Sequence, residues 1–216
     1  MTEELINELK QMREVLNSNG ICLSRPVLDI KYIQNGSGYK NSLSKVLSNL
    51  FPNEFSFNNG IKVKSIEGVL HSFKVNNNKQ ILYTQYAGFD AYALRATIPN
   101  DWRKNHKLYW QGKEYDRFSI EYQELLNSLY YSIYTESPIF NGALYNSKEN
   151  ILFHKNNATQ EETVLTADEY LTRLTVLRSF ITDDMSIYSP TYKNNERLIR
   201  DTLTESIEHF ARSKHL

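Results

Sequence analysis

The sequence predicts a mainly α-helical α+β domain with a small β-sheet, and three observations support this class. Apolar residues recur at spacings of three and four along most of the chain, which is the pattern of helices that bury one face. The alternating run from Phe55 to Val63 is interrupted by Asn-Asn-Gly, which is typical of a β-hairpin. The 216 residues suffice for one domain with a substantial core. We therefore expect a compact single domain.

Both ends of the sequence show the pattern of an added helix. The run from Thr2 to Asn17 predicts an amphipathic helix, and Tyr192 to Ser213 predicts a last helix. We expect residues 1–20 to form an N-terminal helix, residues 21–182 the main domain and residues 183–216 a C-terminal helical extension. The first helix carries too many charges for a signal peptide, and no apolar run approaches the ~20 residues of a membrane span. We therefore expect a cytoplasmic protein.

The helix that organises the main domain is predicted from Ser65 to Lys74. Its apolar positions recur at i, i+3, i+4 and i+7, and Ser65 is a suitable N-cap. Further elements are expected after this helix along the chain. They are helices at 79–87 and 89–96, the long helix Ser119–Glu136, a helix opened by Ser137-Pro138, a strand Asn150–His154, and a helix that starts at the capping box Thr166–Glu169 and finishes near Arg178.

Composition excludes several classes of protein. Lys+Arg and Asp+Glu both number 25, so the net charge is zero and gives no general attraction to nucleic acid or to membranes. The single cysteine, Cys22, excludes an internal disulfide and a cysteine-based zinc site. Five scattered histidines show no ligand spacing. We therefore expect no metal and no cofactor.

The polar residues Glu67, His71 and Lys74 are spaced by four and three, so they form a stripe beside the apolar face of the same helix. A carboxylate, an imidazole and an amine on one edge of a half-buried helix suit a catalytic site. The alternative is a solvated polar face with ordinary helical pairs, which are common and only weakly stabilising.

Other candidates carry open alternatives as well. Arg103, Lys104 and Lys107 form a local basic excess that could hold a phosphate, or they belong to a solvated loop. Trp110 stands beside a glycine-permitted turn and could stack on a flat ring, although such a tryptophan is usually part of the core. Asn49 could bind a ligand or satisfy its own turn.

An ordered series of motifs gives a further indication. It comprises Leu47-Ser-Asn-Leu-Phe-Pro52, the hairpin, Ser65-Ile-Glu-Gly-Val-Leu-His-Ser-Phe-Lys74, Tyr109-Trp-Gln-Gly-Lys113, a strand ending in His154, and a helix ending in Leu177-Arg178. This series resembles the NADAR-like family of small N-glycosidases, which includes enzymes that cleave riboflavin intermediates. The resemblance spans about residues 28–181.

The resemblance implies a hydrolase that cleaves the N-glycosidic bond of an ADP-ribose-linked or phosphoribosyl-amine substrate. Glu67 would be the general base or charge stabiliser, which agrees with an oxocarbenium-like transition state. Lys74 would hold a phosphate or form an imine. The substrate-binding residues would be Asn49, His71, Trp110, Gln111, Lys113, His154 and Arg178.

Two departures from that family bear on the activity. His71 stands where relatives often have glutamine, so we treat it as a modifier of its neighbours. The long helix has Ser132-Ile133-Tyr134 where relatives often show Ala-Lys-Phe, so a covalent lysine there would be missing. Catalysis would then depend on Glu67 and Lys74, or be absent.

Two rival functions follow. One is a non-catalytic pocket that sequesters an ADP-ribose-type nucleotide, and it would be indifferent to Glu67→Gln. The other is removal of ADP-ribose from a modified nucleic acid, whose affinity should fall steeply with salt. We expect no membrane partner, and a monomer or a homodimer.

Overall fold

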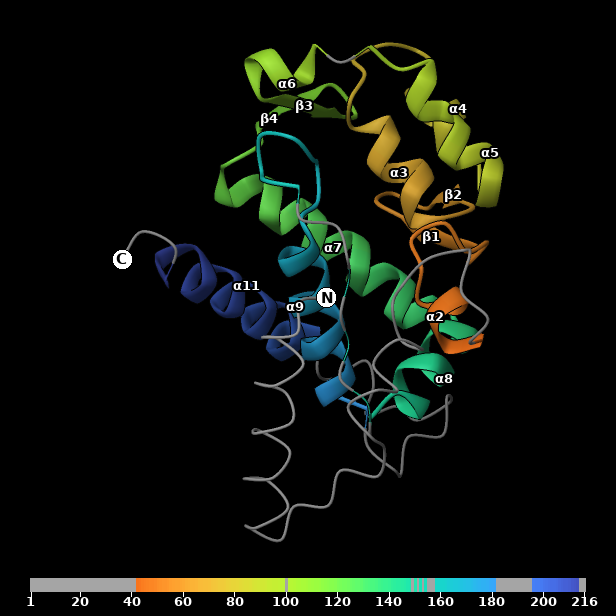
Figure 1. Ribbon diagram of the computed structural model, residues 1–216, viewed down its shortest axis with the longest axis vertical. Helices are drawn as coiled ribbons and strands as arrows, with labels where there is room; N and C mark the ends of the chain where they lie inside the picture. The colour runs from red at the N-terminus through yellow and green to blue at the C-terminus, as the bar shows by residue number, and fades with distance from the viewer. Residues whose placement is uncertain are drawn as a thin grey trace, which may run out of the picture.

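The computed structural model describes residues 42–99, 101–148, 158–181 and 196–213, together with Asn150, Leu152 and His154. These residues form a mainly helical α+β fold with two small antiparallel hairpins, which confirms the predicted class (Figure 1). The elements are α2 (Ser42–Val46), β1 (Phe55–Phe57), β2 (Ile61–Val63), α3 (Ile66–Ser72), α4 (Gln80–Tyr83), α5 (Gly88–Ala93), the 3-10 turn η2 (Leu94–Ala96), α6 (Trp102–Asn105), β3 (Lys107–Trp110), β4 (Lys113–Asp116), α7 (Ile120–Glu136), α8 (Pro138–Asn146), α9 (Ala167–Ser179) and α11 (Glu196–Ser213).

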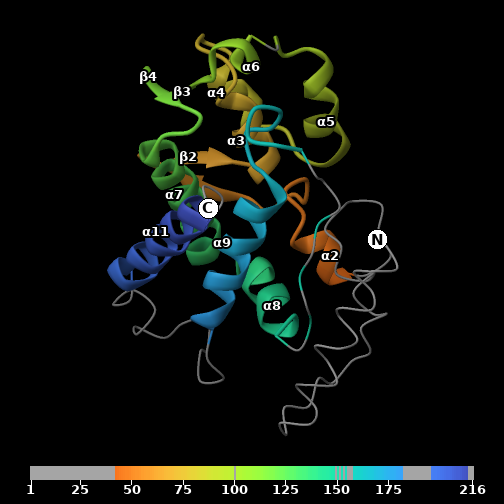
Figure 2. The ribbon, with the colours of Figure 1, turned by 60° about the vertical axis from the view of Figure 1, so that its left-hand side comes forward.

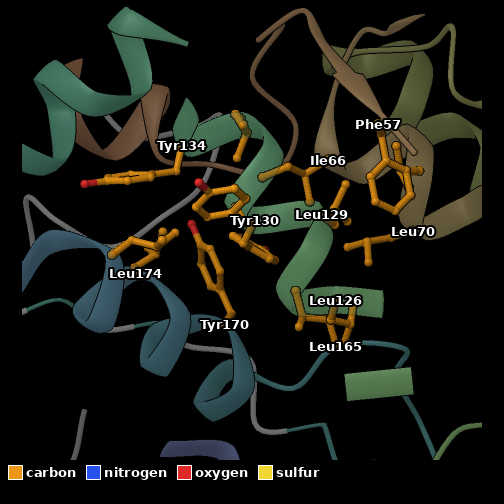
Figure 3. Close-up of a cluster of buried hydrophobic side chains, with 14 of the residues drawn as sticks. Phe57, Ile66, Leu70, Leu126, Leu129, Tyr130, Tyr134, Leu165, Tyr170 and Leu174 are labelled. Carbon is orange, nitrogen blue, oxygen red and sulfur yellow. The ribbon is translucent and has the colours of Figure 1, made fainter. Parts of the chain in front are cut away.

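Helix α7 runs through the middle of the molecule and contributes eight buried residues to the main core. It contacts β1 on one side and α8, α9 and α11 on the others (Figures 1 and 2). Its apolar face is buried, and it includes Tyr122, Leu125, Leu126, Leu129, Tyr130 and Ile133. Figure 3 shows several of them packed against Phe57 and Leu70 on one side and Leu174 on the other.

The β1–β2 hairpin forms as predicted. Phe55 pairs with Val63 and Phe57 with Ile61, and Gly60 adopts a φ of +77° at the turn. A second hairpin, β3–β4, was not predicted as such. Its turn depends on Gln111 and Gly112, which both have positive φ angles. Two consecutive positive φ angles suit a tight two-residue hairpin turn, and this explains the glycine at position 112.

Helix α3 also forms as predicted, and it carries the polar residues Glu67 and His71. The Ser65 side chain accepts a hydrogen bond of 3.0 Å from the backbone N–H of Gly68, so it caps the helix. The apolar stripe of Ile66, Val69, Leu70 and Phe73 is buried. Gly68 permits a close approach to the next segment, because a Cβ there would lie 2.7 Å from the carbonyl oxygen of Tyr83.

The later helices are capped at their starts, and the caps at Ser137 and Thr166 were predicted. Ser119 and Ser137 each accept a backbone hydrogen bond at the start of α7 and α8, and Pro138 occupies the first turn of α8. At α9, Thr166 and Glu169 form the reciprocal capping box. These signals are local in sequence, and they mark the helix starts correctly.

A buried ion-pair network ties β4, α7 and α9 together. Arg117 and Glu169 form a two-pronged pair at 3.0 and 2.7 Å, and both are almost completely buried. Arg173 donates to the backbone and side chain of Gln123. Arg117 also donates to the backbone oxygen of Thr163 at 2.8 Å, so the network holds the segment that precedes α9.

One expectation about the later chain needs correction. The strand predicted at Asn150–His154 is wrong, because the described residues of that stretch lie in no strand. The Arg178 side chain donates to the backbone oxygens of Ser147 and Asn150, which are therefore bonded to a side chain instead of a neighbouring strand. Helix α11 packs on α7 and α9, with Ile199 and Leu203 buried in the common core (Figure 2). Its apolar face thus has a partner within the chain.

The predicted N-terminal helix and Cys22 lie outside the described residues, as do residues 183–195 of the expected C-terminal extension. Within the described part of the chain, no helix is long and apolar enough to cross a membrane.

Candidate functional site

The predicted stripe on α3 forms a chain of three contacting side chains. The Nε2 atom of His71 lies 3.2 Å from Oε1 of Glu67. The other ring nitrogen, Nδ1, lies 3.0 Å from Nζ of Lys74. The two ring nitrogens of His71 thus face the two charged groups, one each. The imidazole is buried and links the two charged groups.

The charges in this chain influence one another. Burial opposes ionisation of Glu67, but the hydrogen bond from His71 and the positive charges nearby outweigh it and lower the pKa of the carboxyl group. Burial lowers the pKa of Lys74 to about 8, against the opposing attraction of Glu67. Glu67 is therefore ionised at neutral pH, while the pKa of Lys74 lies close to neutral pH.

The Glu67 side chain keeps about 26% of its surface exposed, so it is only partly buried. Asn49 and His154, which the sequence analysis singled out, lie near it. The backbone oxygen of Asn49 accepts the Glu67 N–H at 2.8 Å, and the positive charge of His154 contributes to the lowered pKa of Glu67. Tyr130 donates its hydroxyl to the Asn49 side chain at 2.8 Å.

Two tyrosines lie next to these polar groups. The rings of Tyr130 and Tyr170 lie 6.0 Å apart, and Figure 3 shows their hydroxyl groups on the same side. The His154 ring meets Tyr170 edge-on at 5.7 Å. Helices α7 and α9 thus contact Asn49 and His154 through these two tyrosines.

A cationic cavity of about 370 Å³ opens at the other end of the stripe, where Lys74 is one of its walls. Arg95 and Arg103 supply two more positive charges, and Glu162 is the acidic side chain of the lining. Lys74 and Arg103 both lie over the Trp102 ring, at 5.9 and 5.6 Å from its centre. The remaining walls come from Ala96, Ile98 and Thr163. Clustered cations around a cavity of this size suit a phosphate or diphosphate.

Of the predicted phosphate-binding residues, Arg103 lies at the cavity and the other two do not line it. Lys104 is exposed on α6, which replaces the expected loop with a short helix. Lys107 forms an exposed ion pair of 2.8 Å with Glu114 across the β3–β4 hairpin. Strand alternation sends its side chain away from the core, which holds Leu108 and Trp110.

Trp110 is a core residue in this structure. Its side chain is 2% exposed and packs against Phe57 at 5.1 Å and Phe73 at 5.6 Å between ring centres. A stacking plate for a ligand needs an open face, so this expectation does not fit the geometry. Gln111 forms the turn, with its backbone N–H bound by Gln80, and Lys113 lies over the Tyr115 ring on the exposed strand β4.

Arg178 also has a structural contact. Its guanidinium binds two backbone oxygens after α8 at 2.8 Å each, and it does not line the cavity. Ile133, at the position compared with a family lysine, is completely buried in the core. The structure therefore gathers Glu67, His71, Lys74, Asn49 and His154, adds Arg103 beside the cavity, and leaves Trp110, Gln111, Lys113 and Arg178 apart.

Three residues of the cavity lining, Arg95, Glu162 and Thr163, are not marked by any pattern in the sequence. Arg95 follows α5, where no charge cluster draws attention to it. Glu162 and Thr163 lie about 90 residues from Lys74 along the chain, so no local pattern connects them. Among the residues that the structure describes, no group of three or more His, Cys, Asp and Glu side chains could hold a metal ion.

The fold and the site define a small helical α+β domain with a partly exposed carboxylate linked to a cationic cavity. The model of the family described as bacteriophage protein GP30.3 matches residues 41–179, so the chain belongs to that family. It is 28% identical over 123 residues, 55% of this chain and 80% of the relative, to an uncharacterized 17.1 kDa protein from the Gp30-rIII intergenic region of enterobacteria phage T4. No solved structure matches the chain.

These comparisons correct the family expected from the sequence motifs. The NADAR-like family does not match, and the GP30.3 family covers the region that carried the resemblance. A short string such as Tyr-Trp-Gln-Gly-Lys can also occur for purely structural reasons. Here it forms a hairpin turn and places a tryptophan ring in the core. Roles inherited from that resemblance no longer have support from it, and the residues must be judged on their geometry.

Proposed function

We propose that the protein is an N-glycosyl hydrolase acting on a small ribosyl compound that carries a phosphate or diphosphate, a class that includes ADP-ribose-linked and phosphoribosyl amines. One observation carries the proposal: a partly exposed, ionised Glu67 is linked through His71 to Lys74, which forms a wall of a cationic cavity. Such substrates combine an anionic group with a sugar that becomes positively charged in the transition state. We propose the cytoplasm, where these metabolites occur, as its compartment.

The cavity would take the anionic end of the substrate. Lys74, Arg95 and Arg103 surround a volume large enough for one or two phosphate groups. Arginine binds phosphate oxygens with two parallel N–H groups, and lysine adds a point charge. Glu162 would repel an anion bound too close to its side, so the phosphate should lie nearer to the three cations.

Glu67 would act on the sugar. When the bond between the anomeric carbon and nitrogen breaks, the ribosyl group acquires positive charge that a nearby carboxylate stabilises. A water oxygen then bonds to that carbon, and its proton passes to the carboxylate and from there to solvent. The leaving nitrogen keeps the electron pair of the broken bond and takes up a proton from solvent. Because its pKa is lowered, Glu67 is better suited to stabilising charge than to acting as a strong base.

His71 and Lys74 would control which groups of the site carry a proton. The imidazole contacts both charged groups, and Lys74 with a pKa of about 8 can exchange a proton near neutrality. Lys74 therefore serves best as a phosphate holder when protonated. The neutral amine is the form that would attack an opened sugar, so the imine route would become more favourable above that pH.

The second candidate is a protein that binds the nucleotide without hydrolysing it. One observation favours it: Lys74 lines the cavity whereas Glu67 does not. Binding would then depend on the three cations alone, and the carboxylate would serve to hold His71 in place.

A direct test compares wild type with Glu67→Gln, and uses Glu114→Gln on the exposed hairpin as the matched control. Each protein is incubated with NAD, ADP-ribose, nucleoside monophosphates and ribosylated pyrimidine phosphates, and the released base is measured by chromatography. We expect release by wild type and by Glu114→Gln, and a loss of at least about 100-fold in Glu67→Gln. Tight binding with no release by any of the proteins would replace the hydrolase proposal with the binding protein.

A further inference from the structure

A pair of exposed aromatic side chains stands beside the cationic cavity on helix α5. Phe89 has 79% of its surface exposed and Tyr92 has 39%. Their ring centres lie 6.2 Å apart, with an angle of 35° between the ring planes. Exposed apolar residues are common, but two neighbouring exposed rings form a surface that a flat ligand can cover.

Arg95 connects this aromatic pair to the cavity. Its guanidinium carbon lies 3.7 Å from the centre of the Tyr92 ring, and the same residue lines the cavity beside Lys74 and Arg103. The series Phe89, Tyr92, Arg95 is thus continuous from an open aromatic face to a cluster of cations. An arginine stacked on a tyrosine also has its fork of N–H groups held in one orientation, which favours contact with phosphate oxygens.

A nucleotide has the same order of chemical groups. Its base is flat and stacks on aromatic side chains. Its phosphates are separated from the base by one sugar, and they bind to cations. We propose that Phe89 and Tyr92 form the base-stacking platform of a nucleotide whose phosphate lies in the Lys74–Arg95–Arg103 cavity. This inference rests on the anion-binding half of the proposed function, and it names the ligand as a nucleotide unit, either free or within a single strand.

The platform differs from other exposed aromatic residues in its surroundings. Tyr145 on α8 is 42% exposed and carries Lys148 over its ring at 4.5 Å, so it matches Tyr92 in chemistry and exposure. It lies on a helix that contributes nothing to the cavity lining. Tyr145 is therefore the matched control for an effect of position.

The test measures binding by calorimetry with full-length protein carrying Glu67→Gln, so that hydrolysis of a ligand does not alter the result. Adenosine monophosphate is compared with ribose 5-phosphate, which has the same phosphate and sugar but lacks the base. We expect the monophosphate to bind on the order of tenfold more tightly. Phe89→Ala should remove most of this advantage and leave ribose 5-phosphate binding unchanged, because the ring that Arg95 contacts is that of Tyr92, whereas Tyr145→Ala should change neither.

Phe89→Trp keeps an aromatic face and should retain the advantage, which separates stacking from a general disturbance of α5. A short oligothymidylate distinguishes the source of the nucleotide. Tighter binding of the strand, with a steeper dependence on salt, assigns a unit within single-stranded nucleic acid, and tighter binding of the monophosphate assigns a free nucleotide.

Two results would overturn the platform. If the monophosphate and ribose 5-phosphate bind equally, the base makes no contact, although the anion cavity and the proposed function remain. If neither ligand binds, the cavity does not hold phosphate and both proposals fall together.

Discussion

The protein contains two clusters in which a carboxylate meets buried cations, and they differ in how completely the carboxylate is satisfied. Glu169 is 2% exposed and accepts from both prongs of Arg117, from the side chains of Gln123 and Gln160, and from the backbone N–H of Thr166. Glu67 keeps 26% of its side-chain surface, and its charged contact within the helix is with His71. The first cluster has no capacity left for a ligand, and the second has.

The difference separates a structural ion pair from a candidate site. In the Glu169 cluster every carboxylate oxygen has donors, and its pKa falls to about 2 despite burial because two arginines outweigh the loss of solvent. In the Glu67 cluster the lysine titrates near neutrality, and its side chain faces a cavity. Unused bonding capacity beside an open volume is thus the feature that points to function.

The two clusters are also connected. Arg117 binds the backbone oxygen of Thr163, and Tyr122 donates to that of Val164 at 2.7 Å. Thr163 and its neighbour Glu162 line the cavity at the other cluster. The structural network therefore fixes one wall of the candidate site.

The largest expected effect breaks the structural cluster. Glu169→Gln leaves Arg117 and Arg173 buried without their counter-charge, and should reduce the free energy of unfolding by about 3–5 kcal/mol. Glu67→Gln should change it by less than about 1 kcal/mol, because that side chain is partly exposed. Urea unfolding followed by circular dichroism measures both. Equal losses in the two variants would contradict the distinction between the clusters.

The next effect is on acid stability. The pKa of Glu169 is lowered from 4.5 to about 2 in the folded state, so its contribution is complete above about pH 4.5 and is lost as the pH falls through about 2. Wild type should lose about 3 kcal/mol over that range from this group. Glu169→Gln should lack this part of the acid limb. Parallel acid limbs in the two proteins would show that Glu169 does not titrate as described.

A smaller effect concerns ligand binding at Lys74. Because burial lowers its pKa to about 8, the ammonium form that holds phosphate is lost as the pH rises through that value. Affinity for ribose 5-phosphate should fall about tenfold from pH 7 to pH 9, in line with the loss of a charge-assisted hydrogen bond. Calorimetry at both pH values tests this. Lys74→Met should bind weakly at each pH, and Lys104→Met, on the exposed face of α6, should behave like wild type.

The smallest expected effect is a change in the pKa of Glu67. His71 lowers the pKa of Glu67 by hydrogen bonding and by its charge, so His71→Leu should raise that pKa. Carboxyl-detected NMR titration measures it, with His106→Leu as a control on another element. An unchanged Glu67 pKa would mean that the imidazole does not couple the carboxylate to Lys74.

Local patterns predicted much of the fold. The 3.6-residue period identified α3 and α7, and the cap residues Ser65, Ser137 and Thr166 marked helix starts correctly, because capping is satisfied within four residues. The Asn-Asn-Gly turn predicted the first hairpin for the same reason. The Asn150–His154 strand failed because alternation alone says nothing about a neighbouring strand, and here a side chain of α9 binds the backbone instead.

The candidate site divides in the same way. The sequence by itself determined that Glu67, His71 and Lys74 share one edge of a helix, since spacings of four and three superimpose on a helical surface. Only the tertiary structure decided that Trp110 lies in the core, that Glu169 is fully bonded, and that Arg95 and Glu162 meet Lys74 at a cavity. The physical reason is that burial and unused bonding capacity depend on which distant segments pack together, and no spacing along the chain contains that information.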